Sequence, residues 1–143
     1  MILRTATMTD AHQLLAWRND PETRANSHRQ DVVGPDTHQA WLPEVLADPA
    51  RTLLIAEEGG VALGTVRLDR DGNEVVLSWT VAPEHRGKGH GTTMVRCAVD
   101  KTRGTRLRAE IAPANARSMA IARAAGFRLN SMRNGMTVWV RQP

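Results

Sequence analysis

The sequence predicts a single mixed α/β domain (residues 1–143), in which about four helices flank a central, mostly antiparallel sheet of six to seven strands. Segments rich in β-branched residues alternate with segments of helical period, in the order strand, two helices, three strands, helix, strand, helix, two strands. A length of 143 residues with 41% hydrophobic content suffices for one domain with its own core. No repeat or linker divides the chain.

The N-terminal third is predicted to contain one strand and two helices. Ile2–Thr5 is a short apolar run that suits a strand. Thr9-Asp10 offers capping oxygens for the first helix, and Asn19-Asp20-Pro21 should break it. The second helix should start at Asp36 or Thr37 and end at Asp48-Pro49.

The remainder is predicted as strands joined by tight turns, with two further helices. Turn residues at 58–60, 71–73 and 134–135 separate runs with strand character. The expected strands are 52–57, 62–69, 74–81, 106–111, 127–132 and 136–140, and the expected helices are 90–102 and 116–125. Gly126 is placed to end the last helix.

Charge and composition exclude several classes of function. The net charge is only +4, and the 19 cations are spread along the chain without a basic run, which argues against a dedicated nucleic-acid site. No apolar run approaches the roughly 20 residues of a membrane span. The N-terminus lacks a secretory pattern and the single cysteine, Cys97, fits a reducing compartment, so we expect a cytoplasmic protein. The histidines form no metal-ligand spacing with Cys97, so no metal is expected.

The segment between the 74–81 run and the helix predicted from His90 has the composition of an anion-binding turn. It contains Gly87, Gly89 and Gly91, interleaved with cations. Glycine lets the main chain approach an anion closely, and a helix start adds free N–H groups and a positive dipole end. The sequence therefore predicts a ligand that carries phosphate here.

Two motifs in this part of the chain resemble those of the GCN5-related N-acetyltransferase (GNAT) family. Arg86-Gly87-Lys88-Gly89-His90-Gly91 matches the family's Arg/Gln-x-x-Gly-x-Gly/Ala signature. Asn115-Ala-Arg-Ser118, followed by Gly126-Phe127, is similar to its Asn-x-x-Ser/Ala … Gly-Phe pattern. The expected element order agrees with the family along the whole chain, so the resemblance implies its fold as well.

The resemblance implies acetyl-CoA as a co-substrate. By that analogy, the amides from Arg86 to Gly91 hold the pyrophosphate, and Thr92 adds a hydroxyl. Backbone groups of Thr80 and Val81 pair with the pantetheine, and Asn115 bonds the pantetheine arm or the thioester region. Asn115 also suits the N-cap of the 116–125 helix, a role compatible with the first. His90 and its loop neighbour His85 either touch phosphate or are simply exposed.

The family chemistry needs an oxyanion donor and a base for the attacking amine. A backbone N–H near Val81 can stabilise the tetrahedral oxyanion. Glu110 and Glu74 are the candidate bases, and water relaying the proton is a third route. Alternation puts Glu110 on the polar face of its strand, where an ion pair with Arg106 or Arg108 is the structural alternative. For Glu74, that alternative is a solvated turn residue.

The chain departs from the family at the step that protonates the leaving sulfur. Many members carry a tyrosine at the position of Ala122, and this chain contains no tyrosine. Release of a thiolate near neutral pH is uphill by only about 1.4 kcal/mol, little beside the roughly 8 kcal/mol or more that catalysis supplies. Water or Ser118 can cover this step, while a binding-only module without catalysis is the other interpretation.

The N-terminal third is expected to recognise the acceptor. Its distinctive residues are Trp17, Arg18, Asn19, Arg24, His38 and Trp41. This arrangement resembles N-acetyltransferases of amino-sugar nucleotides, as in the pseudaminic acid pathway, and more loosely those of ribosomal-protein N-termini. Tryptophan offers a face on which a sugar or base can stack, and arginine can form bidentate hydrogen bonds with phosphate. Core packing of Trp17 and Trp41 and helix capping by Arg18 and Asn19 are the alternatives.

These expectations combine into one functional hypothesis. The chain should transfer an acetyl group from acetyl-CoA to a primary amine of a small molecule, with an amino-sugar nucleotide as the first guess. Protein or peptide N-terminal acetylation and non-catalytic acyl-CoA binding are the alternatives. A homodimer is possible, because the C-terminal hairpin (127–140) or an edge strand could pair between chains.

Overall fold

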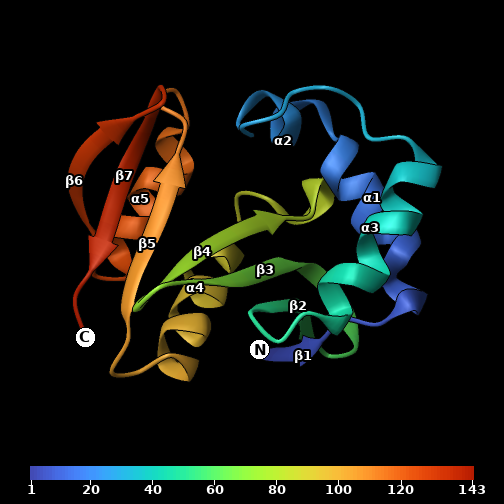
Figure 1. Cartoon of the computed structure of the whole chain (residues 1–143), viewed down its shortest axis with the longest axis horizontal. Coiled ribbons are helices and arrows are strands. Elements are labelled where there is room, and N and C mark those ends of the chain that lie inside the picture. The colour runs from blue at the N-terminus through green and yellow to red at the C-terminus, as the bar shows by residue number, and fades with distance from the viewer.

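A computed structural model describes residues 1–143 and has a seven-stranded sheet at its centre (Figure 1). The strand order is β1-β2-β3-β4-β5-β7-β6. All neighbouring strands are antiparallel except β4 and β5, which are parallel. The strands are β1 (Ile2–Thr5), β2 (Arg51–Glu58), β3 (Val61–Asp71), β4 (Glu74–Val81), β5 (Arg106–Ile111), β6 (Arg128–Arg133) and β7 (Met136–Arg141). The predicted fold class is confirmed.

Five α-helices and two 3-10 turns connect the strands, one helix more than the sequence predicted. They are α1 (Ala11–Asn19), α2 (Pro21–Ala25), α3 (Pro35–Ala47), α4 (His90–Lys101), α5 (Ala116–Ala124), η1 (Met8–Asp10) and η2 (Pro83–His85). None of the helices has the length and apolar character that a membrane span requires.

The additional helix is α2, where Pro21 was expected only to break the chain. Pro21 instead occupies the first helical turn, where its missing N–H breaks no hydrogen bond. The side chain of Asp20 caps this helix by accepting from the Thr23 amide at 3.1 Å. The end of α1 and the start of α2 are therefore separated by Asp20 alone. From the local sequence, such a junction cannot be distinguished from a helix that ends in a loop.

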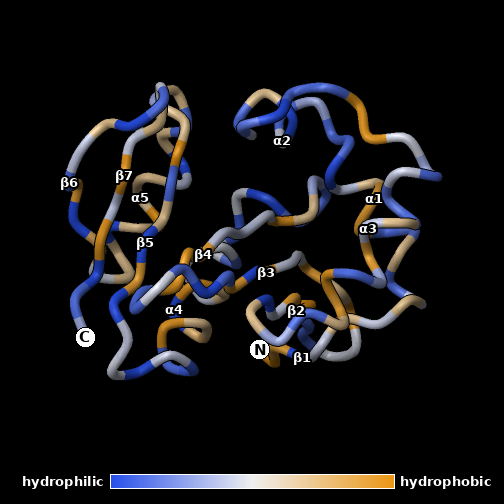
Figure 2. Tube along the Cα trace, viewed as in Figure 1, coloured by the Kyte–Doolittle hydropathy of each residue, from blue (hydrophilic) through white to orange (hydrophobic).

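The sheet is covered on both faces, and β2 shows this most directly. Leu53 and Ile55 pack with residues of α1 and α3, whereas Leu54 and Ala56 pack in the larger core with residues of α4 and α5. Because successive side chains point to opposite faces of a strand, β2 is buried on both sides. Figure 2 shows that the chain around α2, in contrast, is mostly hydrophilic, and no residue of α2 is buried.

Strand β6 lies at one edge of the sheet and contains no buried residue. Its apolar side chains Leu129 and Met132 are exposed. An exposed edge strand can pair with another chain. Association through the C-terminal hairpin stays a prediction.

The sheet opens where its two parallel strands diverge. β4 and β5 pair only at Glu74↔Arg106, Val75↔Leu107 and Val76↔Arg108. Ion pairs of Arg108 with Glu74 and with Asp71 (3.0 Å) hold the closed end. Beyond Val76 the strands separate, and Figure 1 shows β4 continuing with β3 while β5 runs with β7 and α5.

Candidate active site

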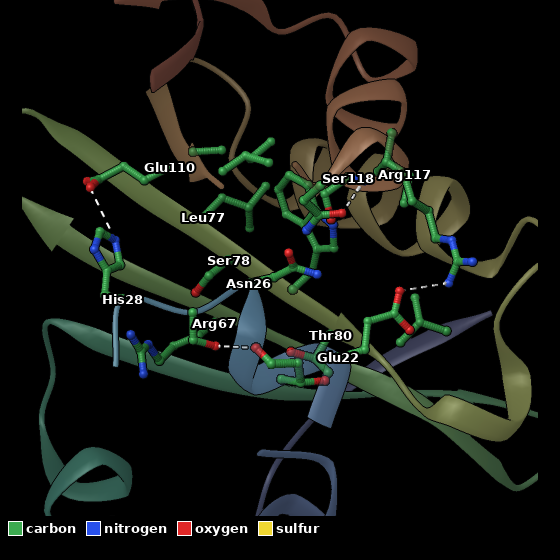
Figure 3. A pocket seen from close by; sticks show the side chains of 18 of the residues that line it. Glu22, Asn26, His28, Arg67, Leu77, Ser78, Thr80, Glu110, Arg117 and Ser118 are labelled. Carbon is green, nitrogen blue, oxygen red and sulfur yellow. Dashed lines mark hydrogen bonds and ion pairs between the residues drawn. The ribbon is translucent and has the colours of Figure 1, made fainter. Parts of the chain in front are cut away.

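A cavity of about 450 Å³ occupies the opening between β4 and β5. Both strands line it, together with α2, the segment after α2, and the start of α5. Figure 3 shows Glu110 with His28 at one end of this cavity and Ser118 with Arg117 at the other. We call it the main cavity. Of the predicted cofactor-binding and catalytic residues, six line this cavity, whereas residues 87–92 of the glycine loop do not. The six are Thr80, Val81, Arg86, Glu110, Asn115 and Ser118.

The opening leaves backbone groups of β4 without a strand partner. Ala82 donates its amide to the Leu63 carbonyl of β3 at 2.8 Å. Successive amides of a strand point to opposite sides, so the Val81 amide points away from β3, towards the opening. Thr80 and Val81 both line the main cavity, as expected from the sequence.

The glycine loop presents a row of free amides. The N–H groups from Gly87 to Thr92 donate to no acceptor within the protein, and the first bond into α4 runs from the Thr93 amide to the Gly89 carbonyl. Gly87 and Gly89 have φ of +77° and +82°, the left-handed region that other residues rarely adopt. The cradle at the α4 N-terminus therefore fits a pyrophosphate.

The other side chains of the loop are placed as follows. Lys88 is exposed, and the rings of His85 and His90 meet edge to face with centroids 6.2 Å apart. The Thr92 hydroxyl forms no hydrogen bond. Gly91 is buried, and a Cβ there would meet Ile121 Cδ1 at 2.5 Å and Val81 Cγ2 at 3.2 Å. Gly91 thus lets α4 pack against β4 and α5.

The Arg86 side chain does not reach towards the loop but holds α2. Its guanidinium donates to Asp20 Oδ2 at 3.0 Å, to Glu22 Oε2 at 2.8 Å and to Thr23 Oγ1 at 2.9 Å. Glu22 also approaches Arg117 of α5 at 3.8 Å. Burial of Asp20 acts to raise its pKa, but hydrogen bonds from the Thr23 amide and Arg86 outweigh burial and lower the pKa below its ordinary value.

Asn115 caps α5, which confirms the helix-capping role expected for it. Its Oδ1 accepts from the Ser118 amide at 3.1 Å. The side-chain amide nitrogen forms no hydrogen bond in the protein, and Asn115 lines the main cavity. The cap thus holds a free donor at the cavity wall.

Glu110 lies in the main cavity beside Arg108 and His28. Its Oε2 is 3.3 Å from Arg108 Nε, and its Oε1 is 3.4 Å from His28 Nε2 (Figure 3). The expected alternation of β5 is confirmed, because Leu107, Ala109 and Ile111 are buried while the residues between them are only partly buried. A carboxylate in a cavity with a histidine beside it can exchange protons with a bound amine.

Glu74 does not share this position, so the structure corrects its candidacy as a base. It pairs with Arg108 and, at 3.6 Å, with Arg106 at the closed end of the opening. It does not line the main cavity. At about 3.3 Å per residue, the start of β4 is roughly 20 Å from Val81.

Ser118 lines the main cavity, but Ala122 does not. Ala122 is completely buried in the larger core, and Ile121 lines the cavity instead. The missing tyrosine therefore corresponds to a core position here. No side chain as large as tyrosine has room there without displacing its neighbours.

A second cavity, of about 320 Å³, holds most of the predicted acceptor residues. Trp17, Arg18, His38 and Trp41 line it. Trp17 is also part of the smaller core, and the His38 and Trp41 rings lie 5.4 Å apart. Burial lowers the pKa of His38 below its ordinary value, which favours the neutral imidazole.

Asn19 and Arg24 line neither cavity, which corrects their expected role as direct acceptor ligands. Asn19 donates to the Val33 carbonyl at 2.8 Å and accepts from the Val33 amide at 2.7 Å. Arg24 donates to the carbonyls of Asn19 (3.2 Å) and Gln30 (3.3 Å). Both therefore hold the segment between α2 and α3 in place.

Sequence reasoning missed several cavity residues, namely His28, Arg29, Arg67, Ser78 and Trp79. One available signal was Arg67, an arginine between Val66 and Leu68 in the middle of a strand. No group of three or more His, Cys, Asp or Glu side chains converges as a metal site would require.

Comparisons with known proteins agree with this geometry. Residues 1–128 match a family model described as "Acetyltransferase (GNAT) domain". No curated protein matches the sequence. Among solved structures, the chain is similar to the ribosomal-protein-alanine N-acetyltransferase of Brucella melitensis, with 25% identity, coverage of 98% of this chain and 97% of that chain, and a TM-score of 0.77.

Two further solved structures share the fold at lower identity. One is aminoglycoside acetyltransferase AAC(6')-Ib with coenzyme A and kanamycin, at 23% identity, 98% and 93% coverage and a TM-score of 0.83. The other is spermidine N-acetyltransferase from Vibrio cholerae with CoA and spermine, at 17% identity, 97% and 92% coverage and a TM-score of 0.84.

Proposed function

Because the chain belongs to the GNAT acetyltransferase family, we propose that it acetylates the primary amine of a small molecule by direct transfer from acetyl-CoA. Both substrates are then held at once in the opening between β4 and β5. The observation that carries this proposal is that Arg86, the first residue of the glycine loop, lines the main cavity together with Glu110. The amides that follow Arg86, from Gly87 to Thr92, have no acceptor within the protein and can bind phosphate.

The residues present fit acetyl-CoA. The amides from Gly87 to Thr92 would hold the pyrophosphate, and the Val81 backbone groups, with the Asn115 side-chain amide, would hold the pantetheine arm. The Thr80 backbone groups point towards β3, which corrects their expected pairing with the pantetheine. Acetyl-CoA, when bound, supplies an acetyl group activated as a thioester. The remaining tasks fall to the chain's own residues.

Those residues divide the chemistry as follows. Glu110 takes a proton from the ammonium, which frees the nitrogen lone pair for attack. The Val81 amide donates to the carbonyl oxygen as negative charge develops on it. A C–N bond forms, which leaves the nitrogen positively charged, and water accepts the second proton from that nitrogen. The C–S bond breaks, and the sulfur leaves with the electron pair. Ser118 or a water molecule returns a proton to the sulfur.

We propose an amino-sugar nucleotide as the first acceptor class to examine. The second cavity, which shares a wall with the main cavity, combines Trp17 and Trp41 with Arg18, and these residue types suit a ring and a phosphate respectively. Protein N-terminal acetylation is the second candidate, favoured by the 25% identity to the Brucella melitensis enzyme over 98% of this chain.

An amine panel tests the proposed function. The protein is incubated with acetyl-CoA and with amino-sugar nucleotides, amino sugars, polyamines or peptides with free N-termini, and thiol release is followed. We expect release with at least one small primary amine and an acetylated product by mass spectrometry. Thiol release with peptides alone supports protein N-terminal acetylation, the second candidate function. Tight binding of acetyl-CoA without transfer to any amine supports the non-catalytic module and contradicts the proposal.

A further inference from the structure

Six residues form a wall between the main cavity and the second cavity, because they line both. They are Arg18, Arg29, Arg67, Ser78, Trp79 and Thr80. They come from α1, from the segment after α2, and from β3 and β4. Three arginines thus converge beside the site of acetyl transfer from segments far apart in the chain.

The positive charge of this wall is only partly compensated. Arg67 pairs with Asp69 at 2.9 Å, whereas Arg18 and Arg29 pair with no carboxylate. The second cavity has no aspartate or glutamate in its lining. Burial and the nearby charges of Arg24 and Arg67 lower the pKa of Arg18, which indicates an uncompensated positive field.

The wall also contains buried donors without acceptors. Arg18 Nη2 donates to the Arg29 carbonyl at 2.7 Å, but Arg18 Nη1 is buried and has no partner. The same is true of Trp79 Nε1. Buried donors are rarely left unpaired, and each exception calls for an explanation. Both side chains line the two cavities, so a rearrangement of them around a bound anion would supply the acceptors.

We infer that Arg18, Arg29 and Arg67 bind an anionic group, phosphate or carboxylate, on the amine acceptor. This inference rests on the proposed function and names the chemistry by which the same site selects its substrate. The acceptor would place its amine towards Glu110 and its anionic group at the wall. Polycations such as polyamines and aminoglycosides would be repelled, since three guanidinium groups face them.

An anion-binding experiment tests the inference without requiring turnover. The protein is first saturated with coenzyme A, so that the glycine loop is occupied. Pyrophosphate and citrate are then titrated by calorimetry into the wild type and into Arg67→Gln, Arg29→Gln and Arg70→Gln. Arg70 lies on the same strand as Arg67, is exposed and lines neither cavity, so Arg70→Gln matches the change in charge.

We expect Arg67→Gln and Arg29→Gln each to weaken binding at least fivefold, while Arg70→Gln leaves it unchanged. Weaker binding of pyrophosphate by these two variants identifies phosphate as the recognised group, and weaker binding of citrate identifies carboxylate. Equal binding by all four proteins, or no binding of either anion, overturns the inference. Arg29 is exposed and Arg67 partly so, so both variants should fold, which circular dichroism checks.

A second measurement separates this inference from the proposed function. Acetyl transfer to glucosamine 6-phosphate is compared with transfer to glucosamine, which differs only in the phosphate. We expect a kcat/KM ratio that favours the phosphorylated amine and falls towards one in Arg67→Gln. A preference for the neutral amine contradicts the inference alone. Absence of transfer to every amine contradicts the proposed function, whatever the anion titrations show.

Discussion

The guanidinium of Arg86 lies 3.0 Å from the carboxylate of Asp20, a contact between residues 66 positions apart in the chain. It joins the glycine loop to the N-terminus of α2, a helix that lines the main cavity. Both side chains are mostly buried, at 16% and 17% exposure, so solvent screens the pair less than a surface ion pair. The glycine loop and α2 are thereby connected, so a change in one should be transmitted to the other.

The first prediction concerns this connection. Arg86→Gln and Asp20→Asn should each weaken the binding of acetyl-CoA and of the acceptor. A double-mutant cycle on the free energy of acetyl-CoA binding should give a coupling free energy of roughly 1 kcal/mol between the two residues. The exposed pair Arg103–Asp100, with 3.3 Å between its charged atoms, is the control and should show almost no coupling. Effects on acetyl-CoA alone, with an unchanged KM for the acceptor, would contradict a mechanical link.

The second prediction concerns Glu110. Glu110→Gln should lower kcat roughly a hundredfold or more, because the amide cannot accept the ammonium proton. The dissociation constant of acetyl-CoA should stay unchanged, since Glu110 lies at the end of the cavity away from α5. The exposed Glu44 of α3, which forms no ion pair, provides the control Glu44→Gln. Full activity of Glu110→Gln would assign proton removal to water.

The third prediction concerns the start of α4. Gly91→Ala should destabilise the fold by about 1–3 kcal/mol and weaken acetyl-CoA binding, because the new Cβ would meet Ile121 Cδ1 at 2.5 Å. Ile121→Val removes that atom. The double variant should therefore lose less unfolding free energy than the sum of the losses in the two single variants. Gly34→Ala, whose Cβ would meet nothing within 4 Å, is the neutral control. Strict additivity in urea denaturation would show that the clash is not the cause.

The fourth prediction concerns protonation of the leaving sulfur. Ser118→Ala should lower kcat by no more than about tenfold, because release of a thiolate near neutral pH is uphill by only about one pKa unit. Ala122→Tyr should destabilise the protein rather than raise kcat, since position 122 is completely buried. Thermal unfolding and steady-state rates check both. A faster, stable Ala122→Tyr enzyme would show that the core can admit the phenol.

The fifth prediction concerns pH. His38 is 5% exposed, and burial lowers its pKa below the ordinary value of 6.5. The unfolded chain therefore binds a proton at His38 more readily than the folded chain, so His38 contributes a loss of stability as the pH falls below 6.5. His38→Gln should reduce the difference in unfolding free energy between about pH 7.5 and about pH 5.5. An identical pH dependence in wild type and variant would contradict this.

The local parts of the fold could be predicted because their causes are local. Alternation in β5 predicted that Leu107, Ala109 and Ile111 are buried. The glycines of the loop predicted a main chain that an anion can approach closely, and Gly87 and Gly89 indeed have the positive φ that only glycine adopts readily. Asn115 predicted a helix cap. Each of these features depends on residues within a few positions of one another.

The candidate site could be predicted only in part. Glu110 and Glu74 are both acidic residues on strands that flank the opening, yet only Glu110 lines the main cavity. The difference follows from the register of β4 against β5, which pairs just three positions at the end where Glu74 lies. Asn19 and Arg24 were predicted as ligands because their residue types suit binding, but their partners are backbone groups. Asn19 bonds Val33, and Arg24 bonds the carbonyls of Asn19 and Gln30.

The sequence by itself determined the order of the strands and of the four longer helices, the glycine loop and the resemblance to the family, because periodicity, caps and glycine conformations are properties of short segments. Only the tertiary structure decided which charged side chains meet in one cavity. Arg18, Arg29 and Arg67 share a wall because α1, the segment after α2 and β3 pack together there. That packing depends on the long-range burial of apolar surface, which no local pattern records.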